Sequence, residues 1–505
     1  MESDVEAASP DSRHGDGPWS GRQNGPVGLA DVTSWVKWAV ESILRSPHGK
    51  GCEDSFRHVF QGGGGLQICT DYSGMGTVEM AIASILDELS LRMGSELAAN
   101  VRFYRAADIA PVCRDILMSP SRSSPEHVFG NVSHRVPVEI RNQLWEAREV
   151  ANKQFASYLQ AGFSSKEAAC LAGDEMAEEM IGTLETCSFA SDARAWCYKH
   201  KRQCRIHGPP HAAECLRIVA AGTTCTSWSS LGSGKGLASD HTIPFLVWAF
   251  ETRAARPHFI VHECTERFSP SILDRIFGRL YEVSSLVFSP TDLGIPSNRP
   301  RRYSLMLLRD AFTLRAPYHL DCFGMLFFRH CVETAHIYAC ASSKEIEDYK
   351  GILAQKRLLP PHRGDGGSWP MRALLSEACH QKLIVYESSA RRKNIELNVI
   401  VNLAQNYSFM NRLSQQAPTL LTKTTLLWDM KEKRLLVPSE YLAIMGVPFH
   451  HPERSDGERF GVERVVLGGS LSPSAVRYVC GNAMHLAAIE AVLLYLLSMA
   501  VATSG

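Results

Sequence analysis

The chain has 505 residues, of which 45% are hydrophobic and 21% charged, which excludes a wholly disordered protein and allows two or three hydrophobic cores. Because Lys plus Arg and Asp plus Glu both number 53, a polyanionic partner would have to be held by a local basic surface and not by net charge. The 15 cysteines are odd in number and scattered, which indicates free thiols in a reducing compartment and excludes a small disulfide scaffold.

The two ends of the chain differ in composition. Residues 1–30 are rich in Gly, Ser, Asp, Pro and Arg without periodicity, so we expect a disordered tail. They also lack the features of a secretory signal, so an intracellular protein is expected. Residues 486–502 are almost wholly apolar and approach the length that spans a membrane. They include Glu490, so a buried helix is favoured and no membrane partner is expected.

Strand-to-helix units recur along the chain. An amphipathic helix is predicted from Asp31, with Asp31 or Thr33 as its cap. A short strand follows before residue 71, then a glycine-containing turn and a helix, and a second strand at 101–108 also runs into a helix. Further strands are predicted at 216–222, 258–263 and 303–308. This order favours an α/β fold with a doubly wound, mostly parallel sheet.

Two domains are expected, without internal repeats. Residues 31–315 form the first domain and carry an insertion at about 137–215 that is rich in Ala, Glu and Leu and is predicted to be helical. Residues 316–460 form a smaller second domain, and residues 461–505 return to the first.

The first turn, at residues 71–77, has glycines two apart where a strand meets a helix. Small residues there let a ligand approach backbone N–H groups at the positive end of the helix, which suits a nucleotide-like cofactor. A tight turn that needs glycine for its backbone angles is an equally good interpretation of the turn alone. Asp108, at the end of the second strand, adds a carboxylate placed to bind ribose hydroxyls, so together they favour an adenosine-containing ligand.

Three later features could carry chemistry. Cys225 follows a predicted buried strand in a loop of hydroxyls and glycines, although a single such cysteine is more typical of an inert thiol. Glu263 ends another strand. Arg299 and Arg301 are two apart before the next strand, so they face the same way in an extended chain.

In their order, these blocks resemble the C5-cytosine methyltransferase family. The turn resembles its Phe-x-Gly-x-Gly cofactor loop, and Gly130-Asn131-Val132 is similar to its Gly-Asp-Ile block. The Cys225 loop resembles Pro-Cys-Gln-x-Phe-Ser, Glu263 stands where the family has Glu-Asn-Val, and the arginines stand in its Gln-x-Arg-x-Arg block. Residues 434–448 and 481–484 resemble the last two blocks. The departures from the family pattern are Thr224, Thr226, Cys264, Thr265 and Ser297.

The resemblance implies a class I methyltransferase fold, S-adenosylmethionine as cofactor, and residues 316–460 as a target-recognition domain. It implies that Cys225 attacks carbon 6 of cytosine, that Glu263 acts at N3, and that Arg299 and Arg301 act at O2. A DNA substrate and a nuclear location follow as expectations. The implied cofactor-binding residues are Tyr72, Ser73, Gly74, Met75, Gly76, Thr77, Asp108, Ile109, Asn131, Val132, Asn482 and Ala483.

Other interpretations remain open at this point. An RNA substrate would keep the reaction, and a catalytically silent, nucleic-acid-binding regulator would keep the fold. An unrelated dehydrogenase would have Gly-x-Gly-x-x-Gly in the first turn, and this chain does not. A double-stranded substrate would require base flipping into the cleft between domains. Arg391, Arg392, Lys393, Tyr407 and Phe409 are candidate nucleic-acid contacts, or solvated surface and core.

A cysteine and histidine pattern lies at the end of the insertion. Cys197, His200, Cys204 and His207 give Cys-x2-His-x3-Cys-x2-His, which could supply four zinc ligands, although the central spacer is far shorter than in a zinc finger. On a helix these residues would share one face, which also suits ordinary packing. Packing is the favoured interpretation, and no metal site is assigned.

Overall fold

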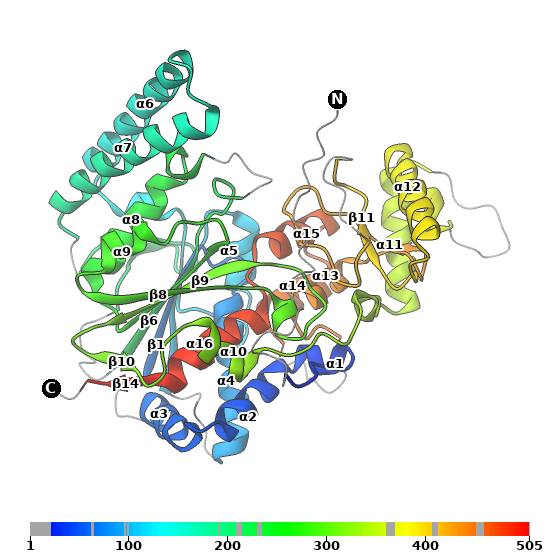
Figure 1. Ribbon diagram of the computed structural model, residues 1–505, viewed down its shortest axis with the longest axis horizontal. Helices are drawn as coiled ribbons and strands as arrows, with labels where there is room; N and C mark the ends of the chain where they lie inside the picture. The colour runs from blue at the N-terminus through cyan, green and yellow to red at the C-terminus, as the bar shows by residue number, and fades with distance from the viewer. Residues whose placement is uncertain are drawn as a thin grey trace.

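A computed structural model describes residues 22–61, 65–94, 97, 100–189, 192–208, 215–229, 235–359, 369–406, 413–450 and 459–503. At its centre lies a seven-stranded sheet of order β3-β2-β1-β6-β7-β9-β8 (Figure 1). Its strands are β1 (Leu66–Asp71), β2 (Val101–Ala107), β3 (His127–Phe129), β6 (Leu216–Gly222), β7 (Phe259–Thr265), β8 (Tyr281–Phe288) and β9 (Arg301–Leu308).

The sheet is parallel except for β9, which runs antiparallel to both of its neighbours, β7 and β8. This order, with one antiparallel strand inserted next to the last, is the sheet of the class I methyltransferase fold, and the predicted doubly wound, mostly parallel architecture is confirmed. β1 is buried along its whole length, as expected of a central parallel strand covered on both faces. The sequence did not predict β8, in which Tyr281, Leu286 and Phe288 are buried and the other five residues are half-buried.

Helices cover both faces of the sheet. The apolar side chains between the sheet and the helices form two buried clusters. The helices around the first cluster are α2 (Trp35–Arg45), α3 (Gly49–Gln61), α4 (Thr77–Met93) and α16 (Leu486–Met499). Those around the second are α6 (Val138–Gln160), α7 (Ser165–Thr186), α8 (Thr242–Ala255) and α9 (Ser271–Phe277). Beside the sheet lie α5 (Pro111–Met118), α10 (Leu320–Phe327), α13 (Pro438–Ile444), α14 (Gly461–Leu467) and α15 (Pro473–Asn482).

The apolar C-terminal segment forms the helix α16, and every one of its side chains is buried. The helix ends at Met499, and β14 (Ala500–Ala502) pairs with β10 (Phe312–Leu314). One stretch, Pro473–Met499, is long and apolar enough to cross a membrane by composition, but 89% of its apolar window is buried within the protein. A buried helix was the favoured interpretation of this segment.

The N-terminal boundary lies earlier than the sequence predicted. Residues 1–21 of the expected tail lie outside the described residues, but Asn24 already pairs with His330, and the N–H of Gly25 donates to the His330 carbonyl at 2.8 Å. The predicted helix is two helices, α1 (Leu29–Thr33) and α2. Neither has a side-chain cap, so the predicted capping is wrong; Asp31 accepts from the Val27 N–H instead.

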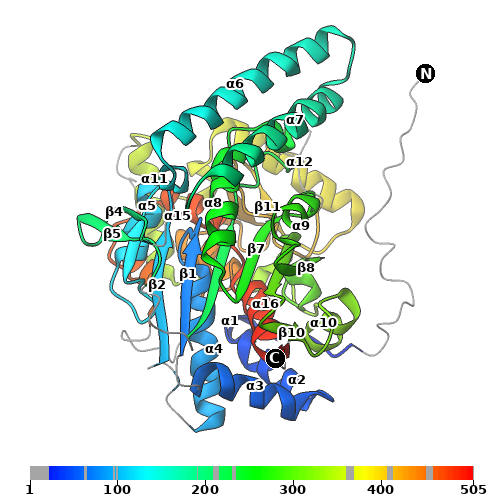
Figure 2. The same cartoon turned by 90° about the vertical axis from the view of Figure 1, so that its left-hand side faces the viewer.

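The insertion is helical only in its first part. α6 and α7 form an antiparallel pair that extends away from the sheet (Figures 1 and 2). Beyond Thr186 the chain turns into a β-hairpin of β4 (Arg194–Cys197) and β5 (Arg202–Arg205), which lies at the edge of the sheet near β2 (Figure 2). The left-handed Lys201, with φ of 51°, lies in its turn.

A second, smaller core lies at the end of the molecule opposite α6 and α7 (Figure 1). It is built on α11 (Ser343–Lys356), α12 (Glu377–Lys393), β11 (Ile400–Asn402), β12 (Leu427–Asp429) and β13 (Arg434–Leu435). This core includes only part of the predicted 316–460 domain. Three residues of that range, Phe323, Tyr338 and Leu442, pack in the main core instead.

Candidate active site

A pocket opens at the carboxyl ends of β1 and β6, the edge at which α/β proteins bind ligands. Its lining includes five residues that the resemblance implied for the cofactor: Tyr72, Ser73, Thr77, Asn482 and Ala483. The other lining residues are Thr70, Asp71, Val78, Ala220, Gly222 and Met484. Met484 was missed as a site residue, although it directly follows the predicted Asn482 and Ala483.

The loop between β1 and α4 is held against the end of β2. Tyr72, Gly74 and Gly76 all have left-handed backbones, with φ of 55°, 56° and 82°, which explains the glycines at two of these positions. The N–H of Ser73 donates to the Ala107 carbonyl at 2.9 Å. The loop therefore has a fixed shape beneath the pocket.

Asp108 shapes this loop. Its two carboxylate oxygens accept hydrogen bonds from the N–H groups of Gly74, at 2.9 Å, and Ala110, at 2.8 Å. Burial raises the pKa of Asp108, while these N–H groups oppose the rise. The Cys113 side chain also bonds to the carboxylate, which still has room for one more donor, so the predicted contact to ribose hydroxyls stays chemically available.

The remaining cofactor residues lie around the same strand ends in different settings. Ile109 is 66% exposed next to Asp108, which leaves an apolar surface at the sheet edge, and the Asn131 side chain accepts from the Ser133 N–H at 3.0 Å. Met75 and Val132 are buried in the two main cores. For these two residues, only the backbone is free to approach a ligand.

Three buried polar atoms near the pocket have no hydrogen-bond partner within the described part of the chain: Tyr72 Oη, Thr77 Oγ1 and Glu79 Oε2. The other oxygen of Glu79 accepts from Thr70 Oγ1 at 2.5 Å. Burial raises the pKa of Glu79 to about 7. Buried orphan atoms carry a cost that a ligand can remove, so this wall suits a polar ligand.

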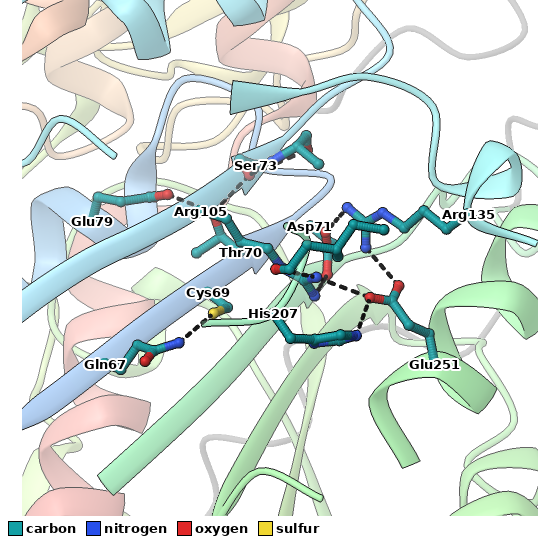
Figure 3. A network of polar contacts seen from close by, with 12 residues as sticks. Gln67, Cys69, Thr70, Asp71, Ser73, Glu79, Arg105, Arg135, His207 and Glu251 are labelled. Carbon is teal, nitrogen blue, oxygen red and sulfur yellow. Dashed lines mark hydrogen bonds and ion pairs between the residues drawn. The ribbon is translucent and has the colours of Figure 1, made fainter. Parts of the chain in front are cut away.

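Behind the pocket lies a buried charge network of Asp71, Arg105, Arg135, Glu251 and His207 (Figure 3). Each arginine bridges both carboxylates: Arg105 contacts Asp71 at 3.0 Å and Glu251 at 2.9 Å, and Arg135 contacts them at 2.5 and 2.7 Å. Burial alone would raise the pKa of Glu251, but Arg135 and Arg105 hold it well below its usual range. The network fixes the end of β1 against α8, and sequence patterns did not reveal it because its members are far apart in the chain.

Cys225 lies in the loop that leaves β6, at the same edge of the sheet. Gly222, the last residue of β6, is in register with Glu263 on β7, and the N–H of Thr223 donates to the Glu263 carbonyl at 3.1 Å. The Cys225 carbonyl accepts from the N–H groups of Trp228 and Ser229, both at 3.0 Å. The thiol is therefore half-buried in a turn beside the end of β7.

A buried histidine supports this loop from below. His262 is fully buried, and its Nε2 lies 2.7 Å from Thr223 Oγ1. It stacks on Trp248, with ring centroids 5.5 Å apart. Burial lowers the pKa of His262 to about 3, so the ring is neutral and acts as a fixed prop for the loop.

Glu263 and Arg301 form an ion pair next to the cysteine loop. Arg301 Nε lies 3.0 Å from Glu263 Oε1, with side chains 10% and 9% exposed. Burial raises the pKa of Glu263, and Arg301 and Arg299 partly offset that rise. Burial therefore favours the protonated form of Glu263, and the two arginines favour its carboxylate form.

The two predicted arginines have different partners. Arg299 is buried and donates to the carbonyls of Leu420, Gly481 and Ala483, at 3.1, 3.0 and 2.6 Å. Burial, with the charge of Arg301, lowers the pKa of Arg299 to about 10. Arg299 thus ties the β9 entry to the pocket wall, whereas Arg301 contacts the carboxylate at the reactive edge.

Gly222 lies between the pocket and Glu263, in close contact with both Met484 and Glu263. A Cβ on Gly222 would lie 2.8 Å from the Met484 methyl group and 3.2 Å from Glu263 Oε2. Any side chain at position 222 would therefore displace one of them. Gly222 and Met484 form the short bridge between the pocket and the candidate catalytic residues.

The predicted cysteine and histidine set is not a helix face. Cys197, His200 and Cys204 converge on the β4–β5 hairpin together with His127 of β3, which the sequence did not assign. His207 lies elsewhere, with its Nε2 3.2 Å from Glu251 Oε1. Of the candidate nucleic-acid contacts, Arg391, Arg392 and Lys393 are exposed in the last turn of α12, and Tyr407 and Phe409 lie outside the described residues.

Comparisons with solved structures give three proteins to which this chain is similar, each at 13% identity. The S. pombe Dnmt2 methyltransferase matches over 86% of this chain and 98% of its own, with a TM-score of 0.39. A putative DNA modification methyltransferase of an E. coli prophage matches over 86% and 99%, with a TM-score of 0.40. The Entamoeba histolytica methyltransferase EhMeth matches over 85% and 97%, with a TM-score of 0.37. No protein-family model and no curated protein matches the chain in sequence. All three similar structures are methyltransferases by name.

Proposed function

We propose that this protein is a cytosine-5 methyltransferase that acts on DNA and uses Cys225 as a covalent nucleophile. The observation that carries the proposal is the buried Glu263–Arg301 ion pair beside the Cys225 loop. Gly222 lies between this pair and the pocket. A thiol, a carboxyl with a raised pKa and a fixed guanidinium are the groups that addition to a pyrimidine ring requires. The segments that carry them, the loop after β6, strand β7 and the start of β9, lie side by side at one edge of the sheet.

Carbon 5 of cytosine is too weak a nucleophile to take a methyl group unaided. In the proposed mechanism, the Cys225 thiolate adds to carbon 6 and forms a C–S bond, and the displaced electron pair moves toward N3. Protonated Glu263 gives its proton to N3, and Arg301 donates hydrogen bonds to O2 as negative charge develops there. Carbon 5 can then accept the methyl group. A base later removes the carbon 5 proton, Cys225 leaves as a thiolate, and N3 returns its proton to Glu263.

The residues around the pocket offer polar groups suited to S-adenosylmethionine, which when bound would supply an electrophilic methyl group. The orphan Tyr72 Oη and Thr77 Oγ1 can bond to its polar groups, and Asp108 retains lone pairs for ribose hydroxyls. The exposed Ile109 offers an apolar surface for a purine ring. Glycines at 74 and 76 let the backbone approach closely.

The substrate is assigned to DNA, and a nuclear location follows if that DNA is chromosomal. A base within a duplex would have to flip out to reach Cys225. Helix α12 belongs to the smaller core, and its exposed Arg391, Arg392 and Lys393 offer a basic surface that phosphate groups can contact. Imaging of a fluorescent fusion tests the location, and exclusion from the nucleus would contradict it.

A methyl-transfer assay tests the reaction and the substrate together. The purified chain is incubated with labelled S-adenosylmethionine and with either duplex DNA or transfer RNA. The proposal expects label at carbon 5 of cytosine in DNA and none with Cys225→Ala. Label in RNA alone would keep the reaction and replace the substrate. Equal transfer by wild type and Cys225→Ala would refute the mechanism, and no transfer to either nucleic acid would favour a silent, binding role.

A further inference from the structure

Four side chains with metal-binding atoms converge at the edge of the sheet, away from the candidate active site. They are His127 on β3 and Cys197, His200 and Cys204 on the β4–β5 hairpin, and their ligand atoms all lie within 4.8 Å of one another. Two thiols and two imidazoles are a donor set that selects zinc among the common cellular cations.

Four of the six distances between ligand atoms match those of a tetrahedral zinc site. His127 Nδ1 and His200 Nδ1 are 3.2 Å apart. The sulfur-to-nitrogen distances are 3.8 Å from Cys197 to His127, 3.5 Å from Cys197 to His200 and 3.6 Å from Cys204 to His200. Bonds of about 2.3 Å to sulfur and about 2.0–2.1 Å to nitrogen place two nitrogens about 3.3 Å apart and a sulfur and a nitrogen about 3.6 Å apart.

The hairpin itself explains how these ligands are presented. Cys197 ends β4 and Cys204 lies on β5, and the intervening turn carries His200. Both cysteines are buried, in a cluster that adds only Ala107 and Phe129. The cluster offers few apolar contacts, and a metal would add bonds between the two strands of the hairpin and β3.

Basic residues surround the four side chains. Lys199, Lys201, Arg202 and Arg205 all lie within the hairpin and are exposed. Zinc binds cysteine as the thiolate. Two thiolates and two neutral imidazoles neutralise one divalent ion.

We propose that His127, Cys197, His200 and Cys204 bind one structural Zn²⁺ that fixes the β4–β5 hairpin to β3. The four protein ligands close the coordination sphere, which is the arrangement of structural and not of catalytic zinc. His207, the fourth member of the sequence pattern, is not a ligand. This inference is independent of the proposed methyl transfer.

The site joins the hairpin to the cofactor edge of the sheet. Tyr198, which follows the ligand Cys197, donates its N–H to the Val128 carbonyl at 2.8 Å. Its ring lies against Gly130, where a Cβ would approach the ring to 3.1 Å, and Arg114 stacks on it at 4.1 Å. The metal therefore supports the wall beside the Gly130-Asn131 block.

Metal analysis of the purified full chain, prepared with reductant and without chelator, tests the proposal. We expect about one zinc per chain by mass spectrometry. Replacement by Co²⁺ should give the strong visible bands of a tetrahedral site and a thiolate-to-cobalt charge-transfer band. Removal of zinc should also loosen the hairpin and speed its cleavage by trypsin after Lys199, Lys201 and Arg202. Less than about 0.1 zinc per chain, or a Cys197–Cys204 disulfide in the reduced preparation, would overturn the proposal.

Variants identify the ligands. His127→Ala and Cys204→Ser should lose the metal, whereas His207→Gln should keep it. Cys170→Ser is the matched control, because Cys170 is an exposed cysteine on α7 outside the cluster. If Cys204→Ser fails to fold, His200→Cys keeps four ligands and should bind Co²⁺ with a spectrum shifted toward three thiolates. Full zinc content in soluble His127→Ala would overturn the assignment.

Discussion

The proton donor is tested by Glu263→Gln. The carboxyl is 9% exposed and lies 3.0 Å from Arg301, and glutamine keeps an oxygen that accepts this hydrogen bond. The folded protein should therefore lose only about 1–2 kcal/mol of unfolding free energy. Proton transfer to N3 is lost, so the methyl-transfer rate should fall by about 10²–10⁴, which equals about 3–5 kcal/mol in the barrier.

The pH dependence gives the sign of the effect. Because burial raises the pKa of Glu263, the wild type should lose activity as pH rises through that pKa and the acid form disappears. Single-turnover rates measured across pH should show this alkaline limb in the wild type and not in Glu263→Gln. Glu490→Gln is the matched control, since Glu490 is a buried carboxyl on α16 outside the site, and its rate should equal that of the wild type. A loss below about tenfold, or an unchanged alkaline limb, would refute the role of Glu263.

Three further predictions follow from other contacts. Burial raises the pKa of Glu490 from 4.5 to about 8, so the folded protein loses stability as pH rises from 4.5 to 8. In denaturant unfolding, Glu490→Gln should remove about 5 kcal/mol of this loss. Parallel curves of unfolding free energy against pH for the two proteins would contradict this. Arg299→Met leaves three buried carbonyls unpaired and should lower the unfolding free energy by about 3 kcal/mol, and an unchanged value would show that Arg299 is no clamp. Tyr198→Ala removes the ring that packs against Gly130. Calorimetry should show S-adenosylmethionine binding weakened about tenfold, with zinc content unchanged. An unaltered affinity would show that the hairpin does not contribute to cofactor binding.

Much of the central sheet could be predicted because its parallel strands are mostly apolar. Asp108 and the Cys225 loop follow the ends of β2 and β6 as predicted, whereas Glu263 lies within β7, two residues before its end at Thr265. The topology brings these strand ends to one edge. β8 was missed because Ser284 and Ser285 interrupt its apolar pattern. Partners from distant segments decide the remaining arrangement.

The metal cluster shows where local spacing fails. The intervals between Cys197, His200 and Cys204 suit both a helix face and a hairpin, and only pairing of β4 with β5 distinguishes them. His207 completes the sequence pattern, but the fourth ligand atom is a nitrogen of His127, 70 residues before Cys197. Similarly, Arg299 and Arg301 look equivalent in sequence, and their different partners come from residues 420–483 and from β7.

Trapping of the covalent intermediate tests whether Cys225 is the nucleophile. Duplex DNA containing 5-fluorocytosine at target positions is incubated with the protein and S-adenosylmethionine, and the adducted peptide is identified by mass spectrometry. Fluorine at carbon 5 cannot be removed as a proton, so elimination of the thiolate is blocked. The account predicts a stable adduct on Cys225 that Cys225→Ala does not form. Turnover on ordinary cytosine without an adduct, or an adduct on another residue, would contradict it.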